Sequence, residues 1–385
     1  MEVKQIYELM NTVTKEVLGE EAIVNEDLSN VVDIGTQVFS ADAVDRYVKS
    51  LVNHIGKVIF VNRPYSGSVP SVLMDGWEFG SVLEKITVEL PDASENESWE
   101  LVDGQSYDPN IFYQPKVSAK FFNKKVTFEI DMSFTEKQVK QSFSNPTQLN
   151  AFMSMLYNAV DRSMTVKMDS LVMRTINNMT AETLRSEYTD DNSYSTKSGV
   201  RAVNLLYLYN QKTGGSLTVD KAMITPEFVR FASMTMANYI DRLRKLSRLF
   251  NIGGKDRFTP SDMLHVVMLS DFKNAAGAYL QSDTFHNEYT ALPDAETVPY
   301  WQASGTTFSF DEISDIHVTT ASGDEVSAAG ILCVMFDRDA LGVTNLERRV
   351  TSNYNSKAEF YNNFYKFDAG YFNDFNENFV CFFVA

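Results

Sequence analysis

The longest regular pattern in the chain runs from Asn145 to near Ala181, without internal glycine or proline. Its apolar side chains recur three or four residues apart, which places them in one stripe along a helix. Asn145 is the expected cap, and Pro146 suits the first helical position because its missing amide hydrogen would have no partner there. At 1.5 Å per residue this helix would be about 55 Å long, so we expect a spine that outgrows a small domain.

Helical spacing of apolar residues predicts further helices over residues 4 to 18 and 41 to 55. A third is expected from Pro226 to Phe250, capped by Thr225. Asp271 is the expected cap of a fourth helix. Helices of this number indicate that the chain is not an all-β protein.

Strands are predicted where apolar and polar residues alternate or where apolar residues run together. Alternation is strict from Lys125 to Phe134, and continuous apolar runs occupy Leu264 to Leu269, Ile331 to Phe336 and Phe379 to Val384. Because the last run nearly reaches the carboxyl terminus, we expect the terminus to be tied into a sheet. Together with the helices, these strands predict an α+β fold.

Residues Tyr65 to Pro115 hold short alternating segments broken by glycine and proline, which predicts an extended hairpin. Within it Ile86, Val88 and Leu90 alternate with polar residues, so we expect this apolar face to be covered. Charged residues of opposite sign are segregated along this part of the sequence, with the acidic residues in the first segment and the lysines in the segment that follows. The acids are Glu89, Asp92, Glu95, Glu97, Glu100 and Asp103, and the lysines are Lys116, Lys120, Lys124 and Lys125. Two interpretations stay open: solvated loop faces, or candidate contacts that pair charges between neighbouring subunits.

Composition indicates a folded chain. With 385 residues and 44% hydrophobic content, it can bury a sizeable core, and no run approaches the ~20 apolar residues of a membrane span. The first residues lack the apolar core of a signal peptide, so we expect a cytoplasmic protein. Cys333 and Cys381 each lie in a strand-like apolar run, which favours buried reduced thiols over a disulfide.

The net charge of the chain disfavours tight binding to nucleic acid. Thirty-four Lys and Arg against 51 Asp and Glu give a net charge of -17, which repels phosphate backbones and argues against wrapping nucleic acid.

Catalytic motifs are weak. The four histidines stand far apart, with no zinc-helix spacing, and Gly253-Gly254-Lys255 lacks the first glycine and the Ser or Thr of a phosphate loop. The best candidate is Asp337-Arg338-Asp339, where two carboxylates at a strand end could hold a divalent cation; the same triplet suits a strand-ending turn. We therefore expect no metal site and no cofactor. An absence of motifs does not by itself exclude an enzyme.

Four segments and the order of the elements carry a resemblance. The segments are GVRAVNLLYLYN (residues 199–210), LHVVMLSDFKNAAGAYL (264–280), GILCVMFDRDALG (330–342) and DAGYFNDFNENFVCFFVA (368–385). They and the order arm, hairpin, spine helix and returning strands are similar to the major capsid proteins of tailed bacteriophages. The resemblance spans nearly the whole chain and includes no catalytic signature. The expectation of no enzyme comes from this resemblance of the whole chain to a structural protein family.

The resemblance implies the tailed-phage major capsid protein fold with four parts. Residues 1–60 would be an amino-terminal arm and 61–115 the extended hairpin loop. Residues 116–190 with 345–385 would form a peripheral domain around the spine helix, and residues 191–344 an axial α/β domain.

The resemblance also implies a function. Copies of the chain would assemble as pentamers and hexamers into an icosahedral shell around packaged double-stranded DNA, without sequence-specific DNA binding and without a membrane. A separate scaffolding protein and a portal protein are the expected partners. The protein would be assembled in the host bacterial cytoplasm and end in the virion capsid.

Alternatives stay open. An encapsulin-like nanocompartment shell would share the fold and would self-assemble around cargo without a scaffold. A cytosolic metal-dependent enzyme would use Asp337 and Asp339. A tail-fibre module is disfavoured by the long spine and by the absence of sequence repeats.

Overall fold

A computed structural model describes most of the chain. The described residues are 3–18, 69–74, 83–91, 93, 103–104, 110, 112, 114–135, 146–188, 193–281, 294–302 and 309–385. The expected helix at 41–55 and the expected cap Asn145 lie outside these ranges.

The chain divides into two compact units, each built from three stretches of sequence. Unit 1 comprises Met1–Gly76, Lys125–Arg174 and Val343–Gly370, and unit 2 comprises Trp77–Lys124, Thr175–Gly342 and Tyr371–Ala385. The chain therefore passes between the units several times.

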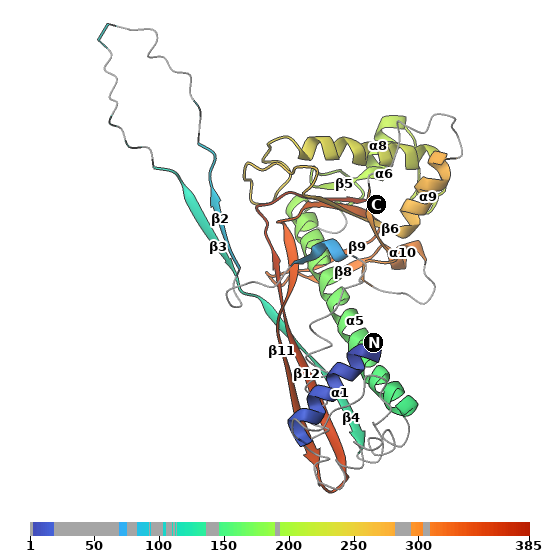
Figure 1. Ribbon diagram of the computed structural model, residues 1–385. Helices are drawn as coiled ribbons and strands as arrows, with labels where there is room; N and C mark the ends of the chain where they lie inside the picture. The colour runs from blue at the N-terminus through green and yellow to red at the C-terminus, as the bar shows by residue number, and fades with distance from the viewer. Residues whose placement is uncertain are drawn as a thin grey trace. The chain divides into compact units, whose positions relative to one another are not determined.

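Unit 1 contains an amino-terminal helix, residues 146–174 of the long helix and a four-stranded sheet (Figure 1). Two strands of this sheet extend into unit 2, β11 with its first residues and β12 with its last. The elements are α1 (Val3–Leu18), η1 (Pro70–Val72), β1 (Leu73–Met74), β4 (Lys125–Thr135), β11 (Leu341–Asn355) and β12 (Phe360–Asn373), and the strand order is β1-β11-β12-β4. The predicted helix at 4–18 and the alternating strand from Lys125 are confirmed. Along β4 apolar residues such as Val126 and Ile130 are half-buried while their neighbours are exposed, which is the expected alternation.

The predicted long helix is confirmed as α5 (Pro146–Glu187), with 42 residues. Its apolar positions from Val160 to Met179 are buried as the spacing requires. Polar residues of its carboxyl-terminal part are buried as well, among them Asn177, Thr180 and Thr183. The Thr180 and Thr183 hydroxyls donate to carbonyls four residues earlier, and Asn177 Nδ2 donates to the Trp301 carbonyl at 2.8 Å. This end of the helix is therefore enclosed by protein on more than its apolar stripe.

Unit 2 is organised around a five-stranded sheet of order β5-β13-β10-β6-β7. The strands are β5 (Ala202–Asn204), β6 (Leu264–Leu269), β7 (Glu296–Val298), β10 (Ile331–Asp337) and β13 (Phe379–Phe383). All three strands predicted from apolar runs are confirmed. β10 is antiparallel to both neighbours, and the two outer pairs are parallel.

The carboxyl terminus is held by this sheet, as expected. Val384 N donates to the Gly330 carbonyl at 3.0 Å, and Asn204 Nδ2 donates to the Ala385 carbonyl at 3.0 Å. β13 joins the sheet of unit 2, whereas β11 and most of β12 belong to unit 1, so residues 345–385 are shared between the units.

Helices and a small hairpin complete the α/β part of unit 2 (Figure 1). They are α6 (Leu205–Thr213), α7 (Val219–Ala222), α8 (Pro226–Leu243), α9 (Ser270–Gln281), α10 (Phe310–Ile313), β8 (Ile316–Thr319) and β9 (Glu325–Ala328). α6 packs on β13 and α9 on β6, while α8 contacts both helices. The sheet core is apolar and includes Phe336, Phe379 and Phe382.

Two helix-end predictions are wrong. α8 ends at Leu243, not Phe250, because the Leu243 carbonyl accepts from Thr259 N at 2.8 Å and the chain then turns into a bridge between Ser247 and Arg257. Asp271 is the second residue of α9 and not its cap.

Candidate functional site

The structure has a hairpin of two strands, both in unit 2: β2 (Leu83–Val88), inside the predicted segment Tyr65–Pro115, and β3 (Val117–Phe122), which begins two residues beyond it. They pair antiparallel with Lys85 opposite Lys120 and Ile86 opposite Ala119. Because side chains alternate between the faces of a strand, the hairpin has one largely apolar face and one polar face.

The apolar face is solvent-exposed, which corrects the expectation that it would be covered. It consists of Ile86 and Val88 on β2 with Val117, Ala119 and Phe121 on β3, and Leu90 beyond β2 is exposed too. Exposed apolar side chains grouped on adjacent strands are typical of a surface that another molecule covers.

The polar face is the half-buried one. Lys85 and Thr87 on β2 and Lys120 on β3 are half-buried, Ser118 on β3 is exposed, and the face ends at the buried Phe122. The Thr87 and Ser118 hydroxyls lie 2.8 Å apart. Alternation was therefore predicted correctly, but the opposite face is turned toward the protein.

Two carboxylates in the turn after β12 meet this polar face. Lys85 Nζ lies 3.1 Å from Asp374 Oδ2 and 2.7 Å from Glu377 Oε1. Lys120 Nζ lies 2.8 Å from Asp374 Oδ1, and Arg257 Nε donates to Glu377 Oε1 at 3.0 Å. The Asp374 and Glu377 side chains are only 2% and 8% exposed. We call these five residues the hairpin base cluster.

The same turn is packed tightly against the loop that carries Arg257. Gly253 N donates to the Phe375 carbonyl at 2.7 Å. A Cβ on Gly253 would lie 2.0 Å from Asn376 Oδ1, so only glycine fits there without a shift.

The other predicted contact residues fall into three groups. Glu89 pairs within the chain with Lys255, at 2.8 Å between exposed side chains, and this pairing holds the Glu89 pKa below its ordinary value. The second group is exposed, and the third lies outside the described residues. Exposed are Asp103, Lys116, Lys124 and Lys125; outside the description are Asp92, Glu95, Glu97 and Glu100.

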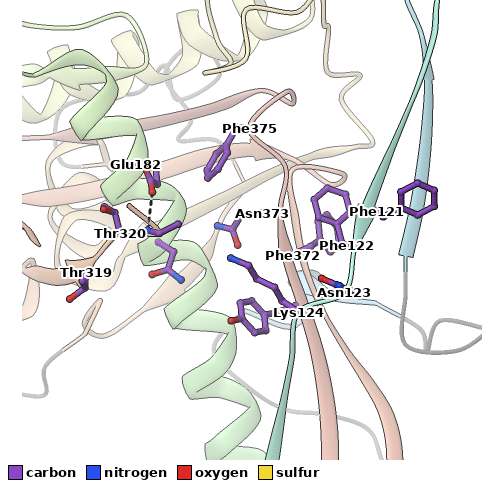
Figure 2. A pocket seen from close by; sticks show the side chains of 13 residues that line it. Phe121, Phe122, Asn123, Lys124, Glu182, Thr319, Thr320, Phe372, Asn373 and Phe375 are labelled. Atoms are coloured by element: carbon purple, nitrogen blue, oxygen red, sulfur yellow. Dashed lines mark hydrogen bonds between the residues drawn. The ribbon is translucent and has the colours of Figure 1, made fainter. Parts of the chain in front are cut away.

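A cavity of about 320 Å³ opens beside the hairpin base, within unit 2 (Figure 2). Phe122 and Phe372 form one wall with ring centres 5.0 Å apart, and Figure 2 shows Phe121 on the other side of the β3 ribbon. Glu182 of α5 lies across the cavity, where its carboxylate accepts from Ala321 N at 3.3 Å. The lining combines aromatic rings with amides and hydroxyls and contains no triad of a nucleophile, a base and an orienting group.

The candidate metal pair forms a turn. Asp337 is buried, its Oδ1 accepts from Asp339 N at 2.9 Å, and burial raises its pKa. The Asp339 carbonyl accepts from Lys85 Nζ at 3.3 Å. Across the described part of the chain, no three His, Cys, Asp or Glu side chains gather in a way that could hold a metal ion. The geometry supports the strand-ending turn.

Two further expectations concern the thiols and the membrane. Cys333 and Cys381 are free and buried, as predicted. None of the helices that the structure describes has the length and apolar character needed to cross a bilayer.

Comparison with known proteins identifies the relatives of this chain. A model of the Phi29-like phage major capsid protein family matches residues 10–383. The capsid structure of Staphylococcus phage Andhra is similar at a TM-score of 0.51 and 10% identity, covering 84% of this chain and 86% of that chain. A chain of the bacteriophage PhiM1 mature capsid gives a TM-score of 0.45 at 9% identity, covering 84% of this chain and 89% of that chain. No curated protein sequence matches the chain. The first similarity supports a shared fold with a tailed-phage capsid protein, and the second, at its lower score, carries no argument.

Proposed function

This chain belongs to the Phi29-like phage major capsid protein family, and on that premise we propose that it closes into an icosahedral shell through contacts between hairpins and neighbouring copies. A major capsid protein is a structural component of the phage head. Such a protein acts by binding to other copies of itself. The proposal therefore concerns which surfaces of the chain are buried between copies.

The exposed apolar face of hairpin β2–β3 supports the proposal. Burying a large aliphatic or aromatic side chain fully is worth about 1.5–3 kcal/mol, so completing the burial of partly exposed residues such as Ile86, Val88 and Phe121 is worth roughly 1 kcal/mol each. One such contact is weak. Every subunit of a closed shell makes several contacts, so their sum drives cooperative assembly.

The four-part division is proposed on the same basis. Residues 1–60 act as the arm and 61–115 as the reaching loop. Residues 116–190 with 345–385 act as the peripheral domain, and 191–344 as the axial domain that gathers at the centres of pentamers and hexamers. Head-to-tail contacts whose rotation closes give such rings.

Charged residues around the hairpin are proposed to select neighbours. Asp103, Lys116, Lys124 and Lys125 are exposed and available for such pairs. Their contribution is to orientation and association rate more than to affinity, because exposed ion pairs contribute little free energy.

Further partners follow from this role. We propose a separate scaffolding protein that guides assembly and a portal protein at one vertex, with assembly in the host bacterial cytoplasm. The net charge of -17 suits a wall that encloses double-stranded DNA without binding its sequence, because a strongly adhering wall would resist packaging and release. The proposed role requires no catalysis.

The test compares two isoleucines of similar exposure. Ile86 on the hairpin is 63% exposed and Ile224 before α8 is 67% exposed. Each is replaced by asparagine, and the full chain is co-expressed with its phage's scaffolding protein. Sedimentation velocity and negative-stain microscopy measure the fraction in closed particles. Ile86→Asn should lower that fraction at least several-fold, while Ile224→Asn should leave it close to the original.

Two outcomes would count against the proposal. If the unchanged chain forms only small species with its scaffold, the shell function is wrong. If both asparagine variants assemble equally well, the hairpin face is not the contact. Closed shells formed by the chain alone around a cargo protein would favour the nanocompartment.

A further inference from the structure

Two lysines face each other on the hairpin. Lys85 and Lys120 are register partners on β2 and β3. Like charges directly opposite each other destabilise a strand pair, and a sheet of only two strands has little stability of its own. The hairpin therefore needs opposite charge close to this position.

Asp374 supplies that charge: its Oδ1 accepts from Lys120, and its Oδ2 forms an ion pair with Lys85. Glu377 continues the cluster, because its Oε1 accepts from Lys85 and from Arg257. Three cations thus surround two carboxylates that are almost fully shielded from water. In such a site each charge depends on its partners, since an unpaired buried charge is far more costly than an exposed one.

The protonation of Asp374 agrees with this geometry. Burial acts to raise its pKa, but the hydrogen bond from Lys120 and the charge of Lys85 outweigh burial and hold the pKa below the ordinary value of 3.8. The carboxylate therefore stays ionised at neutral pH, and the cluster keeps its ion pairs there.

We propose that Asp374 is the positioning residue of the hairpin: it binds both of the paired lysines, Glu377 binds Lys85 as well, and together they fix the base of β2–β3, polar face inward, on the turn between β12 and β13. The apolar face that carries Ile86 is thereby presented outward in one orientation. The inference rests on the proposed function only for the use of that face, because the hairpin base cluster forms within a single free chain.

The structure offers a matched control. Glu89 follows β2 and pairs with Lys255 at 2.8 Å, so it joins the same hairpin to the same loop region as the base cluster does. The side chains of this pair are both about half exposed, and exposed pairs contribute little. Removing this pair changes the charge of the hairpin connection without touching the buried cluster.

The test is hydrogen exchange with mass spectrometry on the full-length free chain. In Asp374→Asn, amides of β2 and β3 should exchange about 10- to 100-fold faster, because the two lysines lose the negative charge that they share. Amides of β10 should change less than about threefold. In the control Lys255→Gln, β2 and β3 should also change less than about threefold.

A rescue variant distinguishes positioning from general stability. The triple change Lys85→Met, Lys120→Met and Asp374→Asn removes the lysine pair together with its acceptor, and exchange at β2 and β3 should return to within about threefold of the original. If Asp374→Asn gives no soluble chain, Lys120→Met replaces it and should accelerate the same strands about 3- to 10-fold.

Three results would overturn the proposal: equal acceleration in the control, acceleration spread evenly over β10 and the hairpin, or a triple variant as fast as Asp374→Asn. Because exchange is measured before assembly, these results are separate from the particle assay. A chain whose hairpin exchange agrees with these expectations but which forms no particles would contradict the proposed function alone.

Discussion

Replacing Gly330 by alanine should destabilise unit 2 more than an ordinary glycine substitution. Gly330 has φ +79°, and its carbonyl accepts from Val384 N at 3.0 Å. A Cβ there would lie 2.0 Å from the Val384 carbonyl oxygen. The backbone of the last residues would have to move, because an ordinary carbon–oxygen contact is more than about 3 Å.

The expected magnitude combines conformation and packing. A side chain at positive φ costs about 1–2 kcal/mol. Forcing atoms into a filled site costs a further ~1–3 kcal/mol, and loss of the Gly330–Val384 hydrogen bond about 1 kcal/mol. We expect Gly330→Ala to lower the free energy of unfolding by about 3–6 kcal/mol.

Gly214→Ala is the matched control. Gly214 ends α6 at φ +66°, and no atom lies within 4 Å of the position that a Cβ on this residue would occupy. Only the conformational part of the cost applies, so the loss should be about 1–2 kcal/mol. The difference between the two variants isolates the steric conflict with Val384 and the loss of its hydrogen bond.

Urea unfolding followed by tryptophan fluorescence and circular dichroism measures both values. Trp301 is a suitable reporter, because it is buried and its Nε1 donates to the Ile331 carbonyl, next to Gly330. With an m-value of about 3 kcal/mol/M, the Gly330→Ala midpoint should fall by about 1 M or more. Equal midpoints for the two variants would refute the close approach of the terminal strand.

Two further predictions concern buried polar groups. Burial raises the pKa of the Cys333 and Cys381 thiols. A maleimide at about pH 8 should therefore leave both thiols unlabelled in the folded chain and label both in urea. Rapid labelling of the folded chain would contradict their burial. Asp368→Asn should cost unit 1 about 1–2 kcal/mol at neutral pH by urea unfolding, since Asp368 accepts from Thr127 at 2.6 Å and from Arg349 at 2.9 Å. Burial acts to raise the Asp368 pKa, but these partners hold it below 3.8. The difference in the free energy of unfolding between the original chain and Asp368→Asn should therefore persist above pH 3.8 and fade as the pH falls further. A difference that stays constant well below pH 3.8 would contradict the ion pair.

Periodicity was sufficient for the elements whose burial is decided locally. The strands β6, β10 and β13 and the helix α5 were predicted because long apolar runs or stripes have few alternative structures. The end of α8 was missed, since the prediction placed it before the helix-stopping residues Gly253 and Gly254. Leu243 is instead the last helical residue because its carbonyl bonds to Thr259, a contact that sequence spacing does not encode.

The polar residues on α5 show a second limit. Spacing predicted one apolar stripe, yet Thr180 and Thr183 are also buried. Their hydroxyls bond to the carbonyls of the preceding turn, so they can be enclosed without unpaired polar groups. The apolar stripe of a helix therefore does not define its full buried surface.

On the hairpin, apolar residues that were expected to be covered are exposed. An alternating strand has two faces, and the sequence alone predicts the period without saying which face is covered. On β2 the face with Lys85 is turned inward because Asp374 and Glu377, far later in the chain, supply its partners. Ile86 and Val88 are consequently left outside. In a protein that acts alone, this would be an unfavourable arrangement. Under the proposed function it is the arrangement that assembly favours, because the hairpin base cluster would orient the hairpin within one subunit and leave its hydrophobic face for contact with the next.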